Sequence, residues 1–315
     1  MKVVIMESLG ISQEELAARK APFEAQGVVF ADYPRSSDPA KLIAQAQDAD
    51  AMILANMPLP AEVIRTCPKL RFIDVAFTGV DHVGLEAARA RGIAVSNASG
   101  YSNEAVAELV LGMALSMARN LRAVEDRCRT GGTKDGLVGW ELKGKTVGIV
   151  GLGKIGTRSA ELFHAFGAKL LACSRSVHKD APDYVVQTDL DDLLRRSDLV
   201  VLHCPLNDST RNLINGERLA MMKPTALLIN VARGPVVDEA ALVEALQRGA
   251  IAGACLDVFP QEPPLDPHSP VIGAPHTLLT PHVAFATKES MSLRAEIVFA
   301  NLQAWMDGKQ QNVVQ

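Results

Sequence analysis

Short apolar, β-branched runs alternate with longer stretches of helical periodicity along nearly the whole chain. Five runs lie at residues 2–6, 28–31, 51–55, 70–76 and 93–95, and six more at 146–150, 169–173, 199–203, 226–230, 251–256 and 278–279. Apolar runs of this length are typical of buried strands. Because parallel strands need crossover connections, the alternation predicts two α/β units, each built on a parallel sheet covered by helices.

The composition is that of a folded globular protein. Of 315 residues, 48% are hydrophobic and 22% are charged, which excludes a disordered or collagen-like chain. The net charge is −4, with Lys and Arg scattered among the acidic residues, so we expect no nucleic acid partner. No window approaches the roughly 18 apolar residues of a membrane helix, and the N-terminus lacks a signal-peptide pattern. These features predict a cytoplasmic protein without a membrane partner.

The cysteines indicate neither a disulfide framework nor a zinc site. There are five, an odd number, and they are widely spaced with no C-x-x-C pair. We therefore expect reduced thiols and no metal.

The strongest local motif is glycine-rich. Gly151, Gly153 and Gly156 form a G-x-G-x-x-G pattern that closes the strand at 146–150 and opens a helix at Lys154. The first glycine permits a tight turn, the second lets the backbone approach a pyrophosphate, and the third lets the helix pack closely on the strand. The helix N-terminus favours the phosphates. This context predicts a dinucleotide site.

The cofactor preference is expected to depend on the end of the next strand. An NAD site usually has an acidic residue there to hold the ribose, but this chain has Ser174 and Arg175. Ser174 can bond a hydroxyl or a phosphate, and Arg175 can pair with a 2′-phosphate. The alternative for Arg175 is a solvated surface position. We expect NADP(H), with NAD(H) as the alternative.

Segments between and after the two series suggest the domain boundaries. Residues 102–120 have apolar side chains at helical spacing, with Ser102 as a candidate N-cap, and should form a helix that bridges the domains. Residues 127–140 are turn-rich and predict an exposed loop or an arm at a subunit interface. A last helical pattern is expected to return to the first domain. We expect a substrate domain over 1–100 plus 290–315 and a dinucleotide-binding domain over 101–289.

Several separated motifs occur together and in a fixed order. They are 97–108 (NASGYSNEAVAE), the glycine loop, 228–234 (LINVARG), 256–259 (LDVF) with Glu262-Pro263, and 280–284 (TPHVA). Together they resemble the D-isomer-specific 2-hydroxyacid dehydrogenase family, over nearly the whole chain. The resemblance implies two Rossmann-like or flavodoxin-like parallel-sheet domains with the active site in the cleft between them. It also implies hydride transfer between NAD(P)H and a 2-oxo or D-2-hydroxy acid, with Arg233, Glu262 and His282 as the catalytic set.

The chemistry of these three side chains fits that implication. Reduction of a 2-oxo acid needs a proton donor for the carbonyl oxygen, and His282, just after a strand, suits neutral pH. A carboxylate such as Glu262 would raise the pKa of the imidazole and orient its ring. Arg233 can hold the substrate carboxylate and polarise the carbonyl. No proton transfer is assigned to His203, His268 or His276.

The resemblance implies further cofactor contacts. They are Lys154 and Ile155 at the pyrophosphate, Cys204 and Pro205 by the adenosine half, Thr210 in the next loop, and Ala232 and Asp257 near the nicotinamide. Asp257 is expected to accept a hydrogen bond from the carboxamide.

The first domain is expected to hold the substrate. Backbone N–H groups of Thr78, Gly79 and Val80, in a turn after a strand, could cradle its carboxylate. Specificity is expected from Asn56 and Tyr101. Because residues 56–63 carry no Lys or Arg, an unphosphorylated acid such as glyoxylate or hydroxypyruvate is expected.

Two alternatives remain at this point. One is a dinucleotide-sensing binding module, since the corepressor branch of this fold has the same three side chains. The other is an enzyme similar to 3-phosphoglycerate dehydrogenase. As a partner we expect a second copy, in a homodimer held by the helix that begins at Ser102 and the arm that ends at Trp140.

Overall fold

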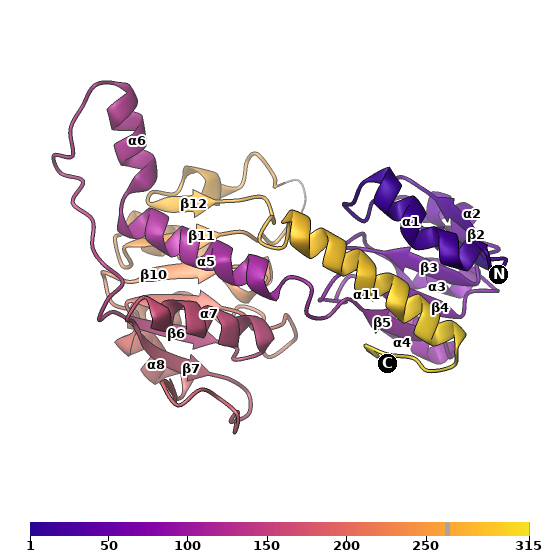
Figure 1. Ribbon diagram of the computed structural model, residues 1–315. Helices are drawn as coiled ribbons and strands as arrows, with labels where there is room; N and C mark the ends of the chain where they lie inside the picture. The colour runs from indigo at the N-terminus through magenta and orange to yellow at the C-terminus, as the bar shows by residue number, and fades with distance from the viewer. Residues whose placement is uncertain (262–264, 315) are drawn as a thin grey trace. The chain divides into compact units, whose positions relative to one another are not determined.

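The computed structural model describes residues 1–261 and 265–314, and the chain divides into two compact units (Figure 1). Unit 1 comprises Met1–Ser102 and Ala286–Gln315, and unit 2 comprises Asn103–Phe285. Within the described residues, no helix combines the length and the apolar composition needed to cross a membrane.

Unit 1 is a five-stranded parallel sheet with the strand order β2-β1-β3-β4-β5. All five predicted strands are present. The strands β3 and β4 are buried along their whole length, which is why β3 appears as an uninterrupted apolar run and β4 as an apolar run broken only by the buried Asp74. The strands are β1 (Lys2–Ile5), β2 (Val29–Asp32), β3 (Ala51–Leu54), β4 (Phe72–Val75) and β5 (Ala94–Asn97). The helices are α1 (Gln13–Glu24), α2 (Pro39–Ala46), α3 (Ala61–Thr66), α4 (Leu85–Ala90) and α11 (Lys288–Met306).

Helix α11 belongs to unit 1 although it follows unit 2 in sequence. It begins at a capping box in which Thr287 and Ser290 exchange side-chain and backbone hydrogen bonds. Near its end, the side-chain amide of Asn301 donates to the buried carboxylate of Asp74 on β4, at 3.0 Å. Trp305 stacks on Phe72 with ring centroids 4.9 Å apart. These contacts attach the C-terminal helix to the sheet.

Unit 2 is a seven-stranded parallel sheet with the strand order β12-β11-β10-β9-β6-β7-β8. The order places β6, the strand before the glycine loop, in the interior of the sheet. The strands are β6 (Thr146–Val150), β7 (Lys169–Cys173), β8 (Val185–Gln187), β9 (Leu199–Leu202), β10 (Leu227–Asn230), β11 (Gly253–Leu256) and β12 (Thr277–Leu279). The helices are α5 (Asn103–Ala118), α6 (Leu121–Arg129), α7 (Lys154–Ala165), α8 (Leu190–Arg196), α9 (Gly216–Met221) and α10 (Glu239–Gln247).

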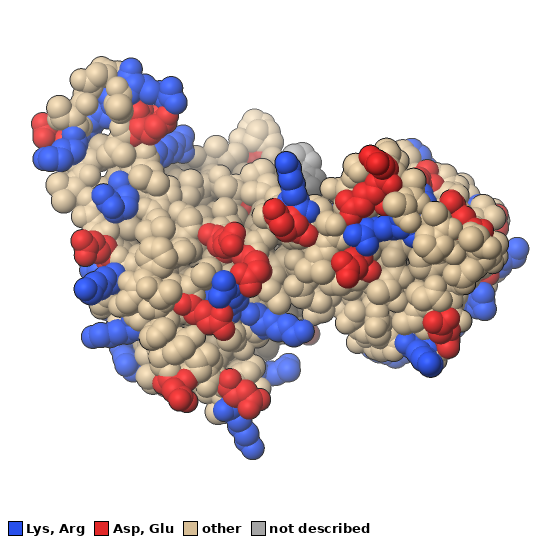
Figure 2. Space-filling model, in the orientation of Figure 1, with Lys and Arg blue, Asp and Glu red and all other residues tan. Residues whose placement is uncertain are grey.

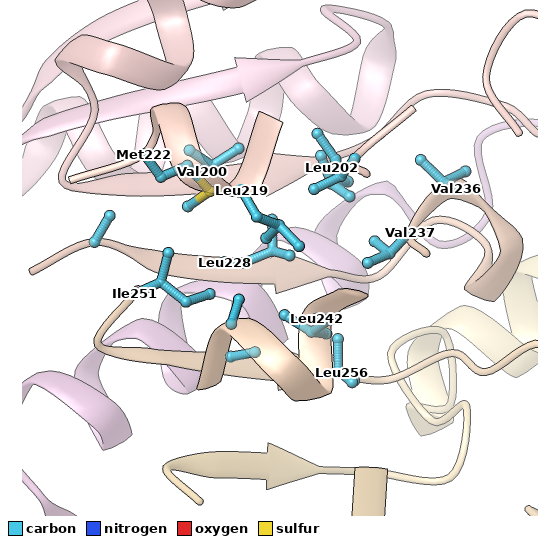
Figure 3. Close-up of a cluster of buried hydrophobic side chains, with 14 of the residues drawn as sticks. Val200, Leu202, Leu219, Met222, Leu228, Val236, Val237, Leu242, Ile251 and Leu256 are labelled. Atoms are coloured by element: carbon cyan, nitrogen blue, oxygen red, sulfur yellow. The ribbon is translucent and has the colours of Figure 1, made fainter. Parts of the chain in front are cut away.

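Hydrophobic cores cover both faces of this sheet. On one face α5 and α7 pack against each other and against the strands. On the other face, side chains of β9, β10 and β11 meet α8, α9 and α10. Figure 3 shows Leu228 and Leu256 beside Leu219 and Leu242 in this second core. Each such buried side chain contributes roughly 1.5–3 kcal/mol, so the sheet is a rigid base for the loops at its edge.

Two elements of unit 2 differ from the sequence-based expectation. The short edge strand β8 was missed because it has three residues, of which Val186 is exposed. The helix expected over 102–120 ends at Ala118, and Asn120 adopts a left-handed conformation before α6 begins. Residues 127–129, which were expected in the loop or arm, therefore belong to a helix.

Helix α6 was not predicted, although Leu121, Val124 and Cys128 recur at helical spacing. None of its residues is buried, and it carries charges of both signs, visible at the upper left of Figure 2. It projects from the rest of unit 2 in Figure 1. The apolar stripe of α6 is narrow and none of its residues is buried within the chain, so the helix was not separated from the turn-rich residues that follow it.

Candidate active site

The glycine loop has the backbone geometry that a dinucleotide requires. Gly151 has a φ of +101°, and a Cβ there would lie 2.8 Å from the backbone nitrogen of Cys204. A Cβ on Gly156 would lie 2.1 Å from the carbonyl oxygen of Gly151. At Gly153, by contrast, no described atom lies within 4 Å of an added Cβ. The first and third glycines thus serve packing, whereas the second leaves open space where a pyrophosphate would approach.

A cavity of about 560 Å³ adjoins this loop. It lies over the first turns of α7, and Gly153 and Lys154 are part of its wall. Its lining carries both signs of charge, with Arg158, His178 and Lys179 beside the acidic Glu104, Glu161 and Asp180.

The two residues predicted after β7, Ser174 and Arg175, have different surroundings. The hydroxyl of Ser174 accepts the backbone N–H of Leu152 at 2.8 Å and so supports the glycine loop. Arg175 is exposed and makes no ion pair with another described residue. Ser174 therefore stabilises the glycine loop, and the guanidinium of Arg175 is available to a ligand.

Residues after β9 support the same region. His203 bonds the Ser159 hydroxyl on α7 at 2.9 Å, and burial lowers the pKa of its imidazole to about 4. It is therefore neutral at pH 7. Burial raises the pKa of the Cys204 thiol to about 11. Thr210 donates to the carbonyl of Pro205 at 2.6 Å, which fixes the loop predicted to lie by the adenosine half.

The turn after β10 presents Arg233. Asn230, only 1% exposed, accepts the Ala232 N–H at 3.1 Å and donates to the Arg233 carbonyl at 3.0 Å. A Cβ on Gly234 would lie 1.9 Å from the backbone of Phe259, so the turn can pass only with glycine there. Sequence reasoning missed the role of Asn230, although a buried amide directly before a functional turn is a usable signal.

The loop after β12 presents His282 and is organised by Asp257, at the end of β11. The fully buried Asp257 carboxylate accepts the Thr280 hydroxyl at 2.5 Å and the N–H groups of Val283 and Ala284 at 2.9 Å each. Burial raises the pKa of this carboxyl, partly offset by these donors and by His282. His282 has a φ of +55°. A residue held in this region costs about 1–3 kcal/mol, which the surrounding hydrogen bonds must offset.

Strand order brings the two predicted catalytic groups of unit 2 to one edge. β10, β11 and β12 are adjacent and parallel, so Arg233 and His282 follow strands on either side of β11. The ring of His282 meets Phe285 edge-on at 5.5 Å. Glu262, the predicted carboxylate partner, lies outside the described residues.

The predicted carboxylate cradle of unit 1 follows β4. The side-chain amide of Asn97 donates to the Thr78 carbonyl at 2.7 Å and holds the turn. None of the N–H groups of Thr78, Gly79 and Val80 donates to another described residue. Consecutive backbone N–H groups left without an internal acceptor are typical of an anion site. The Tyr101 ring lies 6.1 Å from that of Phe77 at the base of this turn.

The sequence analysis did not predict the contact between Arg35 and Asn56 in unit 1. Asn56, the predicted specificity residue, accepts a hydrogen bond from the guanidinium of Arg35 at 2.6 Å. No cation is found in residues 56–63, but Arg35 arrives from the segment after β2. Nothing in the local sequence signals this approach, because the two residues meet only through strand order.

Comparison with known proteins identifies the family. The model for the "D-isomer specific 2-hydroxyacid dehydrogenase, NAD binding domain" matches residues 111–284, more than half of the chain. The chain belongs to this family. The glyoxylate reductase of Thermofilum pendens is 42% identical over 287 residues, which cover 88% of this chain and 84% of that protein.

Solved structures of related chains have the same fold. A protein of Thermus thermophilus gives a TM-score of 0.90 at 34% identity, with both chains fully covered. An acyclic imino acid reductase, solved in complex with NADPH and D-Arg, gives a TM-score of 0.90 at 27% identity, again with both chains fully covered. The two parallel-sheet domains and the family resemblance are thus confirmed. This 2-hydroxyacid dehydrogenase is an oxidoreductase that uses a nicotinamide dinucleotide.

Proposed function

We propose that this dehydrogenase uses NADPH to reduce a small, unphosphorylated 2-oxo acid of the glyoxylate or hydroxypyruvate type to the D-2-hydroxy acid. The observation that carries the proposal is the hydrogen-bonded frame at the end of β11, which presents His282 on one side of Asp257 while the Asn230 turn presents Arg233 on the other. The name of the Thermofilum relative supports the substrate class.

His282 is the proposed proton donor to the carbonyl oxygen that becomes the 2-hydroxyl. Glu262 is the proposed partner that orients the imidazole ring and stabilises its charged form. Arg233 would bind the substrate carboxylate and polarise the carbonyl. The bound dinucleotide supplies the hydride.

Unit 1 is proposed to share the substrate carboxylate with Arg233 and to contact the substrate tail. The N–H groups of Thr78, Gly79 and Val80 have no acceptor among the described residues and can donate to the carboxylate, and Gly79 allows its close approach. Asn56 and Tyr101 are the proposed contacts to the substrate tail.

Selectivity for NADPH is proposed to come from Arg175. No acidic residue stands at the end of β7 to hold a ribose 2′-hydroxyl, and the exposed guanidinium has no ion-pair partner among the described residues. A 2′-phosphate would gain a charge-assisted contact there. Ser174, Lys154, Ile155, Cys204, Pro205, Thr210, Ala232 and Asp257 are the other proposed cofactor contacts.

The test is turnover. Oxidation of NADPH and of NADH is followed with a panel of short 2-oxo acids, for the native protein, His282→Ala and the control His268→Ala, whose side chain is exposed. We expect turnover with at least one acid, its loss in His282→Ala by roughly 100-fold or more, and no change in the control. Tight dinucleotide binding without turnover of any acid would contradict the proposal and favour the dinucleotide-sensing module.

A further inference from the structure

A buried carboxylate joins three loops at the carboxyl edge of the unit 1 sheet. Glu7 follows β1 and is 6% exposed. Its Oε1 accepts the N–H groups of Ala55 at 2.8 Å and Met57 at 2.7 Å, on either side of Asn56. Its Oε2 accepts from the Arg35 guanidinium at 2.9 Å. The loops after β1, β2 and β3 are thereby fixed to one another.

Arg35 also determines how the Asn56 amide faces. One guanidinium nitrogen donates to both Glu7 Oε2 and Asn56 Oδ1, at 2.9 and 2.6 Å. A guanidinium has only donors, so it can accept no amide hydrogen, and the side of Asn56 that faces it must be the oxygen. The Nδ2 amide group of Asn56 therefore faces away from Arg35, and it makes no hydrogen bond with any described residue.

The positive charge of Arg35 is largely offset by the carboxylate of Glu7. Glu7 carries the opposite charge within hydrogen-bond distance, so the pair has no net charge to offer a phosphate dianion. What remains for a ligand at Asn56 is a neutral, fixed N–H donor. A hydrogen-bonding site of this type discriminates strongly against a substrate that lacks the matching acceptor, because the donor is then left unpaired.

We propose that Glu7 and Arg35 are positioning residues for substrate specificity. They fix Asn56 so that its Nδ2 donates to the tail of the bound acid, and they thereby select 2-oxo acids with an oxygen on carbon 3 over acids with a bare methyl group. The inference rests on the proposed function, and it adds the class of tail and the residues that set it.

The test compares hydroxypyruvate with pyruvate, which differ by that oxygen. The ratio of kcat/KM for the two acids is measured for the native protein, Arg35→Met and Asn56→Asp. Asn56→Asp keeps an acceptor for Arg35 and replaces the Nδ2 donor by a charged oxygen acceptor, so it tests the same idea if Arg35→Met does not fold. The control is Arg71→Met, since Arg71 makes an exposed ion pair with Asp50 at the opposite edge of the same sheet.

We expect the native protein to favour hydroxypyruvate at least tenfold. Each variant should lower the ratio at least tenfold, through KM for hydroxypyruvate, while the ratio in Arg71→Met and the dissociation constant for the dinucleotide stay within twofold. A merely structural role would change both acids alike. Turnover with an unchanged ratio in a folded variant overturns this inference alone, whereas no turnover of any 2-oxo acid by the native protein overturns the proposed function and this inference with it.

Discussion

The backbone N–H of His282 donates to the carbonyl oxygen of Asp257 across 2.7 Å, while the carboxylate of Asp257 accepts the N–H groups of the next two residues. One residue at the end of β11 therefore holds the left-handed turn from which the proposed proton donor projects. The turn is formed by the protein's own hydrogen bonds, so the donor is positioned before any ligand binds.

Replacement of Asp257 by Asn should disturb this turn. An amide has one acceptor oxygen, so its NH2 group would face a buried N–H donor that the carboxylate now satisfies. We expect a loss of about 1–3 kcal/mol in the free energy of unfolding and a fall in kcat of at least tenfold. Urea unfolding and turnover assays check this, with the exposed Asp183→Asn as the control. Native stability and kcat in Asp257→Asn would contradict the role.

Substitution of Gly153, the second glycine of the loop, should affect dinucleotide binding without affecting folding. Because Gly153 has an ordinary φ of −79° and no described atom within 4 Å of an added Cβ, Gly153→Ala should fold normally. The methyl group would occupy the approach of the pyrophosphate, and we expect dinucleotide affinity to fall about tenfold or more, a loss of about 1.4 kcal/mol. Fluorescence titration with NADPH measures this. Gly273→Ala, also in open space, is the control, and unchanged affinity would argue against the proposed phosphate position.

Arg175→Ala should change cofactor preference rather than overall binding. Loss of a charge-assisted contact of about 1.5–3 kcal/mol predicts at least a tenfold weaker dissociation constant for NADPH, with little change for NADH. Arg248→Ala, an exposed arginine directly after α10, serves as control. An equal NADPH to NADH ratio in native and Arg175→Ala protein would refute the preference for NADPH.

Asp74 predicts a pH dependence of stability. Burial raises the pKa of this carboxyl well above its ordinary value, and Asn301 offsets that only in part. Between the unfolded pKa, about 3.9, and the raised folded pKa, the folded state holds a proton that the unfolded state has lost, so stability falls as pH rises. Asp74→Asn removes this loss. We expect the variant to gain stability relative to the native protein as pH rises above about 3.9 in urea unfolding, and a pH-independent difference would contradict the mechanism.

The projecting helix α6 leads to a prediction about assembly. Leu121 and Val138 are 50% and 80% exposed, and none of the α6 side chains is buried within the chain. We infer that a second copy covers this segment in a homodimer. Sedimentation should give a dimer for the native protein and a shift to monomer for Leu121→Glu with Val138→Glu. A native monomer at assay concentration would overturn the inference.

Much of this fold could be predicted because its signals are local in the chain. The buried parallel strands are mainly apolar runs, and the glycine loop places its three residues within six positions. Local signals were misread where a narrow apolar stripe stays exposed, as in α6, or where an element is too short, as in β8. The boundary at Asn120 depended on a single left-handed residue.

The sequence by itself determined the two parallel sheets, the dinucleotide loop and the family, because apolar periodicity and closely spaced motifs depend on neighbouring residues. Only the tertiary structure decided that Asp257 holds the His282 turn and that Glu7 and Arg35 orient Asn56. These partners lie between 21 and 50 residues apart along the chain, and they meet because parallel strands bring the loops at their carboxyl ends to one edge. These contacts could not be predicted from the sequence because they depend on strand order, which no local sequence pattern determines.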